Sequence, residues 1–336
     1  MSETLGTLDA PVLVLADLDG TRPTDPALEL VAAARTLTGG GGDVVALTLG
    51  PVEAEASAAL AAAGANRLLV ADLGGERAQA AAGADAVVAA VHEVAPGAVL
   101  VSSDYRGKET AGRAAVLLDS ACVSDVADLR VADGALHASR LVLSGSWSTT
   151  MSANAHTVHP PILAVRPGSV EVPDASVDDA APLPAVALEA AVSPEAAAVR
   201  LVSRESTAAA AGPDLAGART VVVGGRGVDG DFDLVRSLAE PLGAAVGATR
   251  VACDEEWIER SAQIGQTGVS IAPRLYIGLG VSGAIHHTSG IQGAGTIVAV
   301  CDDSEAPIFE MADFGVVGDV TEVVPQLVAE LDRLRG

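Results

Sequence analysis

Short apolar runs alternate with longer, alanine-rich segments through the first half of the chain. The runs are rich in Val and Leu and end near Asp, Gly or Ser, which is typical of strands buried in a parallel sheet. The segments between them predict helices, two of which start at Asp25-Pro26 and Gly50-Pro51 with proline in the first turn. The strands are expected at Val12–Ala16, Val44–Leu49, Leu68–Ala71, Ala98–Ser102, Leu141–Leu143 and Ile162–Val165, and the helices at Pro26–Thr36, Val52–Ala63, Ala78–Val94 and Lys108–Leu118.

This alternation stops between Arg166 and Pro184, where prolines and an acidic run predict a linker or an irregular edge segment. A connector follows at Val199–Ala211, and we place the domain boundary near Thr207–Pro213. The pattern then restarts with strands expected at Thr220–Val223, Ala245–Val251, Leu275–Gly278 and Thr296–Val300, and helices at Phe232–Pro241 and Thr321–Leu334. We therefore expect an α/β protein with domains at 1–206 and 207–336, each a mainly parallel sheet flanked by helices.

Composition supports this architecture and limits the kinds of partner that the protein is expected to bind. The 336 residues are 49% hydrophobic but only 2% aromatic, so the cores must consist of Val, Ala, Leu and Ile. A net charge of −24 argues against a nucleic-acid partner, which would require a basic surface. Every apolar stretch of 18 residues is interrupted by a charged residue or glycine. The N-terminus also lacks the basic start and apolar core of a signal peptide. We therefore expect a cytoplasmic protein without membrane insertion. The widely spaced Cys122, Cys253 and Cys301 are expected to be buried thiols.

A first glycine-rich turn, Gly224-Gly225-Arg226-Gly227, follows a predicted strand and precedes a helix. Such a turn presents backbone N–H groups and the positive end of a helix dipole, which suit a pyrophosphate. Arg226 adds donors that match phosphate geometry. The turn lacks the full GxGxxG spacing, so it is equally well explained as a turn that packs a helix on a sheet.

Two further turns carry polar groups. Gly265-Gln266-Thr267-Gly268 presents an amide and a hydroxyl that can both donate and accept hydrogen bonds, although an ordinary turn would have the same composition. Ser282–His287 contains adjacent histidines without a third ligand at i+3 or i+4, so no metal site is expected. One histidine could stabilise negative charge on a reduced flavin, or could simply be a hydrogen-bonded core residue. Arg250, at the end of a predicted strand, could face a ring or the solvent.

Together these segments resemble the FAD domain of the electron-transfer flavoprotein α subunit. The resemblance is carried by Val221–Gly227, Val246–Val251, Gly265–Gly268, Pro273–Gly290, Thr296–Val300 and Ala306–Gly315. The first half is more loosely similar through Val99–Arg113, Val123–Val126 and Ile162–Pro167, so nearly the whole chain is covered. The family implies a nucleotide-hydrolase-like N-terminal domain that contacts the partner subunit, and a Rossmann-like C-terminal domain that holds FAD.

The resemblance also implies function. It predicts a heterodimer with a β subunit, which accepts electrons from dehydrogenases such as acyl-CoA dehydrogenases in fatty acid oxidation and passes them to a membrane quinone oxidoreductase. The chain would then be an electron carrier rather than an enzyme. The implied cofactor-binding residues are Gly225, Arg226, Gly227, Thr249, Arg250, Ile264, Gly265, Gln266, Thr267, Ser282, Gly283, Ala284, Ile285, His286, His287, Cys301, Asp302, Asp319 and Val320.

Individual roles follow from the family pattern. Arg226 matches the arginine near the FAD phosphates, and Arg250 matches the arginine that faces the flavin ring. The Thr267 hydroxyl falls near flavin N5 and His287 near N1/O2, which makes Arg250, Thr267 and His287 the residues expected to tune the flavin. Asp319 and Val320 match the adenosine end. The chain departs from the family pattern at His286, where glutamine is frequent, at Cys301, where asparagine is frequent, and at Trp147, where small residues are usual.

Two other functions remain open from the residues alone. A stand-alone NAD- or flavin-dependent dehydrogenase would need a general acid or base at the ring, and only His286 or His287 could supply it. A nucleotide-binding scaffold without redox function would need no such group. Motifs of hydrolases and NTPases are missing from the sequence, which contains no GxSxG, no HExxH and no Walker lysine.

Overall fold

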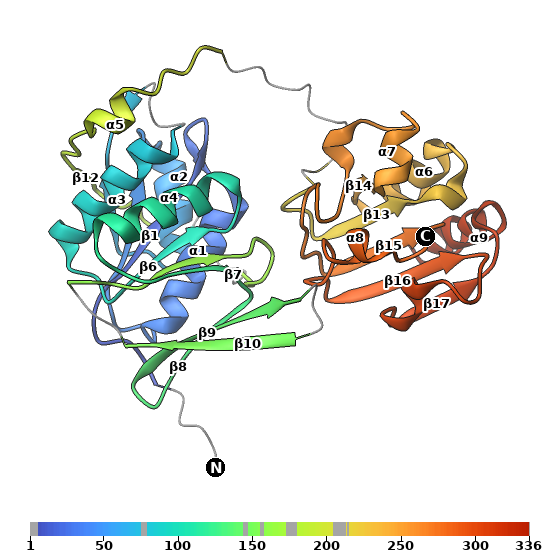
Figure 1. Cartoon of the computed structure of the whole chain (residues 1–336), viewed down its shortest axis with the longest axis horizontal. Helices are drawn as coiled ribbons and strands as arrows, with labels where there is room; N and C mark the ends of the chain where they lie inside the picture. The colour runs from blue at the N-terminus through green and yellow to red at the C-terminus, as the bar shows by residue number, and fades with distance from the viewer. Residues whose placement is uncertain are drawn as a thin grey trace. The chain divides into compact units, whose positions relative to one another are not determined.

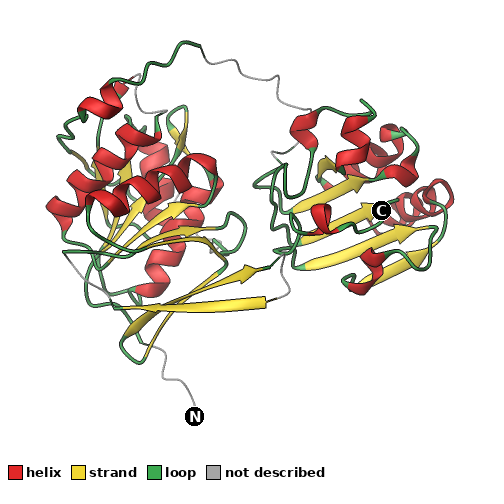
Figure 2. Cartoon of the chain, in the orientation of Figure 1, coloured by secondary structure: helices red, strands yellow, loops and turns green. Residues whose placement is uncertain are grey.

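The chain divides into two compact units, Met1–Val142 with Ser146–Glu205 and Leu143–Gly145 with Ser206–Gly336. The computed structural model describes residues 6–74, 79–143, 147–154, 158–172, 180–203, 213 and 215–335. Each unit is a parallel sheet with helices on its faces, as Figures 1 and 2 show, so the expected α/β class is confirmed.

The first unit contains a seven-stranded sheet in the order β12-β5-β4-β1-β6-β11-β7, in which every pairing is parallel. Its strands are β1 (Val12–Leu15), β4 (Val44–Thr48), β5 (Arg67–Val70), β6 (Ala98–Ser102), β7 (Cys122–Val126), β11 (Ile162–Val165) and β12 (Ala185–Ala187). Its helices are α1 (Asp25–Leu37), α2 (Ala54–Ala63), α3 (Ala80–Val94), α4 (Tyr105–Leu117) and α5 (Pro194–Ala197).

Alternate residues of each strand face opposite layers of helices. Val12 and Val14 of β1 belong to the core formed with α1 and α2, whereas Leu13 and Leu15 belong to the core formed with α3 and α4. Burial on both faces explains why the strands read as continuous apolar runs. Helix α4 begins three residues earlier than expected because the Asp104 carboxylate accepts a hydrogen bond from the Gly107 N–H at 2.7 Å and caps it.

An antiparallel sheet of β8 (Asp128–Ala132), β9 (Ala135–Val142) and β10 (Trp147–Ala153) was only partly predicted. The expected strand at Leu141–Leu143 is the end of β9. The rest was missed because polar residues interrupt the apolar pattern of β8 and β9, and because β10 is largely exposed. A signal was present: Asp133 and Gly134, with φ of 52° and 78°, form the two-residue turn that joins β8 to β9. A small hairpin, β2 (Leu18–Asp19) with β3 (Arg22–Pro23), completes the unit.

One other expectation, on the burial of the cysteines, needs correction. Cys122 is exposed, whereas Cys253 and Cys301 are buried as expected. The segment Arg166–Pro184 leads to the edge strand β12, a strand too short and too exposed to show as an apolar run. Its residues 173–179 lie outside the described part of the chain.

The second unit is a five-stranded parallel sheet in the order β14-β13-β15-β16-β17. The strands are β13 (Thr220–Gly224), β14 (Ala245–Ala248), β15 (Leu275–Leu279), β16 (Thr296–Cys301) and β17 (Phe314–Val317), and the helices are α6 (Phe232–Leu242), α7 (Arg250–Asp254), α8 (Ile285–Thr288) and α9 (Val320–Arg335). Short 3-10 turns lie at η3 (Arg226–Val228), η4 (Arg260–Ala262) and η5 (Pro307–Glu310).

The two faces of this sheet are covered differently. Helices α6 and α9 pack on one face, next to Val222 of β13. Turns and short helices pack on the other face, where Ile264 and Ile308 join Val223. The predicted strand Ala245–Val251 ends at Ala248, because Thr249 is the N-cap residue of α7. Edge strand β17 was missed because all four of its residues are exposed.

Within the described ranges, no helix has a stretch long and apolar enough to cross a bilayer. Among the same residues, no group of three or more His, Cys, Asp and Glu side chains could hold a metal ion.

Glu29 on α1 is expected to make the stability of the first unit depend on pH. Burial raises the pKa of this carboxyl group to about 7, a rise that the hydrogen bond from the Gly168 N–H (2.7 Å) opposes and that Asp25 adds to. Because the folded-state pKa exceeds the unfolded value of 4.5, this contribution to stability is complete below pH 4.5 and is lost as the pH rises through 7.

The Glu29→Gln variant keeps an oxygen that can accept from Gly168 but carries no charge. Above pH 7 we expect it to be more stable than the parent by roughly 1 kcal/mol, and below pH 4.5 this advantage should disappear. Urea denaturation at pH 4, 6 and 8 measures the difference, with Glu109→Gln on the exposed side of α4 as the control. A stability difference that is the same at all three pH values would contradict this assignment.

Candidate functional site

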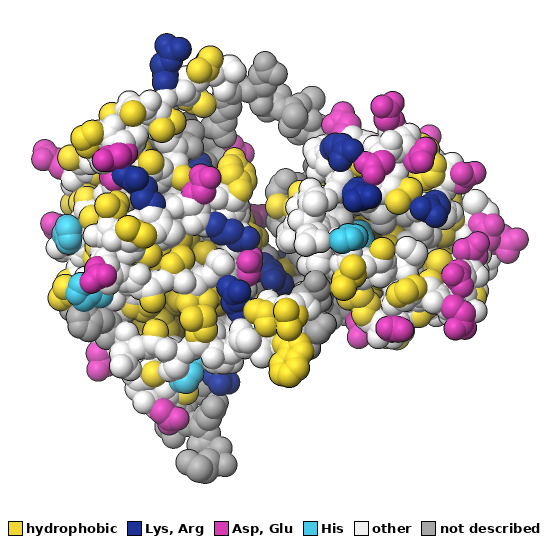
Figure 3. All heavy atoms as spheres, in the orientation of Figure 1, with side chains coloured by type: hydrophobic (Ala, Val, Ile, Leu, Met, Phe, Trp, Pro, Cys, Tyr) yellow, Lys and Arg dark blue, Asp and Glu magenta, His cyan; other side chains and the backbone are white. Residues whose placement is uncertain are grey.

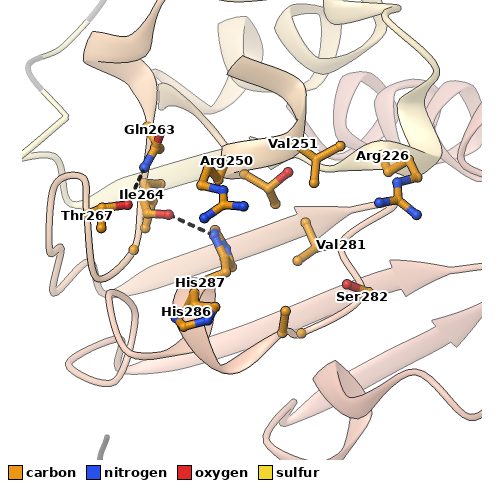
Figure 4. Close-up of a pocket in the computed structure, with 14 residues that line it drawn as sticks. Arg226, Arg250, Val251, Gln263, Ile264, Thr267, Val281, Ser282, His286 and His287 are labelled. Carbon is orange, nitrogen blue, oxygen red and sulfur yellow. Dashed lines mark hydrogen bonds between the residues drawn. The ribbon is translucent and has the colours of Figure 1, made fainter. Parts of the chain in front are cut away.

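A pocket opens in the second unit where β13, β14 and β15 end, and the turns that follow these strands form its walls (Figure 4). The carboxyl edge of a parallel sheet is where α/β proteins bind their ligands. The residues that line the pocket are Arg226, Thr249, Arg250, Val251, Gln263, Ile264, Gly265, Thr267, Val281, Ser282, Gly283, Ala284, His286 and His287.

The first glycine turn is used differently from what its sequence suggests. The N–H groups of Gly225 and Gly227 donate to the carbonyl oxygens of Leu279 (2.9 Å) and Gly280 (3.0 Å). A Cβ atom on Gly225 would lie 2.2 Å from the Gly280 carbonyl oxygen. These two glycines therefore join the turns after β13 and β15, and their N–H groups are not available for a pyrophosphate. The Arg226 side chain is what this turn directs to the pocket (Figure 4).

Arg250 enters the pocket because α7 begins there. The Thr249 N–H donates to the Gly224 carbonyl at 3.0 Å, which holds the chain beside β13 until the helix starts. Arg250 Nε lies 3.3 Å from the Asp254 carboxylate, one helical turn further on. The same carboxylate bonds Arg260, whose Nη2 lies 2.6 Å from it. In Figure 4 the guanidinium group of Arg250 extends into the pocket, which His287 also lines.

The turn around Gly265 packs directly against α8. Gly265 has a φ of +141°, and a Cβ atom there would lie 2.3 Å from the His286 carbonyl oxygen. The Gln266 N–H donates to that same carbonyl oxygen at 2.7 Å. Only glycine combines this φ with so close an approach of two backbones. The contact brings Thr267 on one turn and the two histidines of α8 to the same pocket.

His287 is 5% exposed, and both of its ring nitrogens are bonded within the protein. Nδ1 lies 3.0 Å from the Ile264 carbonyl oxygen, and Nε2 lies 2.8 Å from the Tyr276 hydroxyl oxygen. Because a carbonyl can only accept, Nδ1 carries a hydrogen, and in the neutral ring Nε2 accepts from Tyr276. Burial raises the pKa of Tyr276, which therefore keeps its proton.

Burial also lowers the pKa of His287 to about 4, against the hydrogen bond to Ile264, which raises it. The ring is thus neutral at pH 7 and brings no charge to the pocket. A hydrogen bond from His287 to flavin N1/O2 would require one of its two present bonds to change.

His286 contrasts with its neighbour because it is exposed. Its Nδ1 lies 2.8 Å from the side-chain oxygen of Gln266, so the residue that departs from the family pattern is tied to the turn at Gly265. Figure 3 shows a histidine side chain at the surface of the second unit, on a face that also carries Lys or Arg side chains.

The remaining predicted residues are not among those that line the pocket. Gln266 and the exposed Ile285 are sequence neighbours of lining residues. Cys301 and Asp302 lie at the end of β16, where Cys301 Sγ and Asp302 Oδ1 are 3.9 Å apart. Asp319 accepts hydrogen bonds from the N–H and hydroxyl of Thr321 at the start of α9. Their predicted contacts with the adenosine end stay predictions.

Sequence reasoning missed three lining residues, Val251, Gln263 and Val281. Val251 and Val281 are apolar neighbours of residues that were selected, and nothing in their type marks them. Gln263 offered a weak signal, a polar residue between Ala262 and Ile264 in front of a glycine turn. It is 3% exposed, and its Nε2 donates to the Thr267 hydroxyl oxygen at 3.0 Å.

A parallel α/β unit with arginine side chains and apolar walls at its carboxyl edge defines a protein that binds a nucleotide-type cofactor. The chain matches the family model "Electron transfer flavoprotein domain" over residues 12–193 and the model "Electron transfer flavoprotein FAD-binding domain" over residues 214–292. The chain belongs to the electron-transfer flavoprotein α-subunit family, as its motifs indicated, and its cofactor is FAD.

Curated relatives named electron transfer flavoprotein subunit alpha match almost end to end. The chain is 39% identical to that of Mycobacterium leprae (strain TN) over 92% of this chain and 94% of the relative. It is 38% identical to that of Mycobacterium tuberculosis (strain ATCC 25618 / H37Rv) over 97% and 100%, respectively. Identity to that of Bacillus subtilis (strain 168) is 33% over 96% and 98%.

The donor set of the pocket fits FAD. Thr267, Arg250 and His286 gather around one part of the pocket, and Arg226 lies at the other end (Figure 4). Apolar walls from Val251, Ile264 and Val281 suit a planar ring system, and an arginine apart from it suits a phosphate.

We expect the Tyr276→Phe variant to destabilise the second unit. Tyr276 is fully buried, and its loss would leave Nε2 of the buried His287 without a donor, at a cost of about 1–3 kcal/mol. Urea denaturation measures this change. The chain provides a matched control in Tyr105→Phe, because Tyr105, its other tyrosine, is 85% exposed and should tolerate the same substitution. Equal effects of the two substitutions would contradict the role of the buried hydroxyl.

Proposed function

We propose that this chain is the FAD-carrying subunit of a heterodimeric electron-transfer flavoprotein and acts as an electron carrier. In this proposal residues 207–336 bind FAD and residues 1–206 contact a β subunit. The names of the curated relatives, which are called subunit alpha, support a second subunit. FAD supplies the chemistry of accepting and releasing electrons, and the protein holds it and sets its potential.

The observation that carries the proposal is the bonding state of His287. A dehydrogenase acting directly on a substrate needs a residue that can accept or donate a proton at the ring. Both nitrogens of the buried histidine are occupied by Ile264 and Tyr276, and its low pKa keeps it neutral. His286 is the only other histidine of the pocket, and its Nδ1 is held by Gln266. This favours electron transfer over proton chemistry on a bound substrate.

The pocket residues would then have separate tasks. Arg250 would place a positive charge beside the ring and so favour its reduced, more anionic state. Thr267 would donate a hydrogen bond to the ring, and Arg226 would bind the phosphates. The turns after β13 and β15, joined through Gly225 and Gly227, would keep these groups at fixed separations.

The donors and the acceptor are inferred from the family. We expect dehydrogenases such as acyl-CoA dehydrogenases to deliver electrons during fatty acid oxidation, and a membrane quinone oxidoreductase to remove them. A cytoplasmic location and a role at the membrane only through this acceptor agree with the composition of the chain.

The proposal is tested by the visible absorption spectrum of the chain co-expressed with its candidate β subunit, followed by reductive titration. Flavin bands in stoichiometric amount, and reduction in two one-electron steps, are the expected result. A colourless complex that added FAD cannot restore would overturn it. Steady oxidation of NADH by the chain without a partner would favour a dehydrogenase instead.

The Arg250→Ala variant should bind FAD more weakly and lower its midpoint potential. Loss of about 1 kcal/mol of attraction to the reduced ring corresponds to roughly 40 mV for one electron. Arg260→Ala is the matched control, since both arginines bond Asp254 but only Arg250 lines the pocket. Unchanged potentials in the Arg250→Ala variant, or equal shifts in the two variants, would show that Arg250 does not set the flavin potential.

A further inference from the structure

Gln263 is a buried polar residue in the pocket wall whose side chain reaches across the turn at Gly265. It follows η4 and is 3% exposed. Its Nε2 donates to Thr267 Oγ1 at 3.0 Å, as Figure 4 shows. Burying a primary amide is unfavourable unless its groups are bonded, so this contact contributes to holding Gln263 in the wall.

The bond determines what the Thr267 hydroxyl can still do. A hydroxyl has one hydrogen and two lone pairs, and here a lone pair receives the amide hydrogen. Across the described residues, no bond in which the Thr267 hydroxyl donates is seen. Its own hydrogen is therefore left over, and because Thr267 lines the pocket, that hydrogen can be donated to a ligand there.

Backbone hydrogen bonds also hold the turn that contains Gln263 and Thr267. The Val269 N–H donates to the Gln263 carbonyl at 2.8 Å, and the Gly268 N–H donates to the Gly265 carbonyl at 3.0 Å. A Cβ atom on Gly268 would lie 2.1 Å from the Gln263 carbonyl oxygen. Residues 263–269 thus form a closed turn that the Gln263 side chain braces internally. Because the Thr267 hydroxyl is held in this turn, little rearrangement of the protein is needed when it bonds a ligand.

We propose that Gln263 is a positioning residue that keeps the Thr267 hydroxyl as a hydrogen-bond donor toward the bound flavin. An amide NH₂ in this place can only donate to Thr267, which prevents the hydroxyl from turning back to bond the wall. The inference rests on the proposed FAD site, where the family resemblance brings Thr267 to flavin N5. It adds to that site a residue that would not touch the flavin ring itself and would act on it through Thr267.

A double-mutant cycle in the assembled heterodimer tests the proposal. Gln263→Met keeps the length of the side chain but removes the amide, and Thr267→Val removes the hydroxyl. We expect Gln263→Met to weaken FAD binding by about threefold to tenfold in the parent, the range of one hydrogen bond. In the Thr267→Val background the same substitution should have no further effect. The ¹⁵N chemical shift of labelled flavin N5, which reports its hydrogen bonding, should follow the same pattern.

Two controls separate the possible causes. Thr267→Ser keeps the hydroxyl, so Gln263→Met should still weaken FAD binding in that background. Gln326→Met on the exposed face of α9 removes an amide far from the turn and should leave binding unchanged. If Gln263→Met weakens binding equally with and without the Thr267 hydroxyl, Gln263 has a merely structural role and the inference is overturned. A parent heterodimer that binds no FAD would instead contradict the proposed function itself.

Discussion

The site depends on the close approach of bare backbones at the carboxyl edge of the second sheet. A Cβ atom on Gly280, whose φ is +62°, would lie 2.5 Å from Gly227 Cα, and one on Gly225 would overlap the Gly280 carbonyl. Gly265 meets α8 in the same way. Any side chain at these positions would push the turns apart. The glycines therefore set the distances between the pocket walls, and every polar group of the site depends on those distances.

Once the turns are this close, most of their polar groups are used within the protein. The N–H groups of Gly225 and Gly227 bond the end of β15, and both nitrogens of His287 bond Ile264 and Tyr276. The groups that remain for a ligand include the guanidinium groups of Arg226 and Arg250 and the hydroxyl hydrogen of Thr267. Recognition thus comes from a few groups that the internal hydrogen bonds leave available.

The sequence predicted the parallel strands well because burial on both faces makes their residues uniformly apolar, as in β1 and β13. It predicted less well where polar or exposed residues interrupt the apolar run, and so β7, β8, β10, β12 and β17 were missed. The glycine turns were located correctly, but the pairing of their N–H groups was not foreseen. That pairing depends on which turns meet in space, and Gly225 and Leu279 are far apart in sequence. The place of Gln263 in the wall was hidden for the same reason.

The charge of the pocket follows from how α7 is built. Arg250 and Arg260 share the Asp254 carboxylate, so the three groups together carry a single positive charge in a chain whose net charge is −24. Asp254 lies one helical turn after Arg250, which fixes the guanidinium at the pocket while Arg260 approaches from outside it. Since His287 is neutral, this buried histidine adds no charge to the pocket, whereas α7 brings the positive charge of Arg250 to it. An arginine cannot lose its proton at physiological pH, so its electrostatic effect on a bound flavin would stay constant across that range.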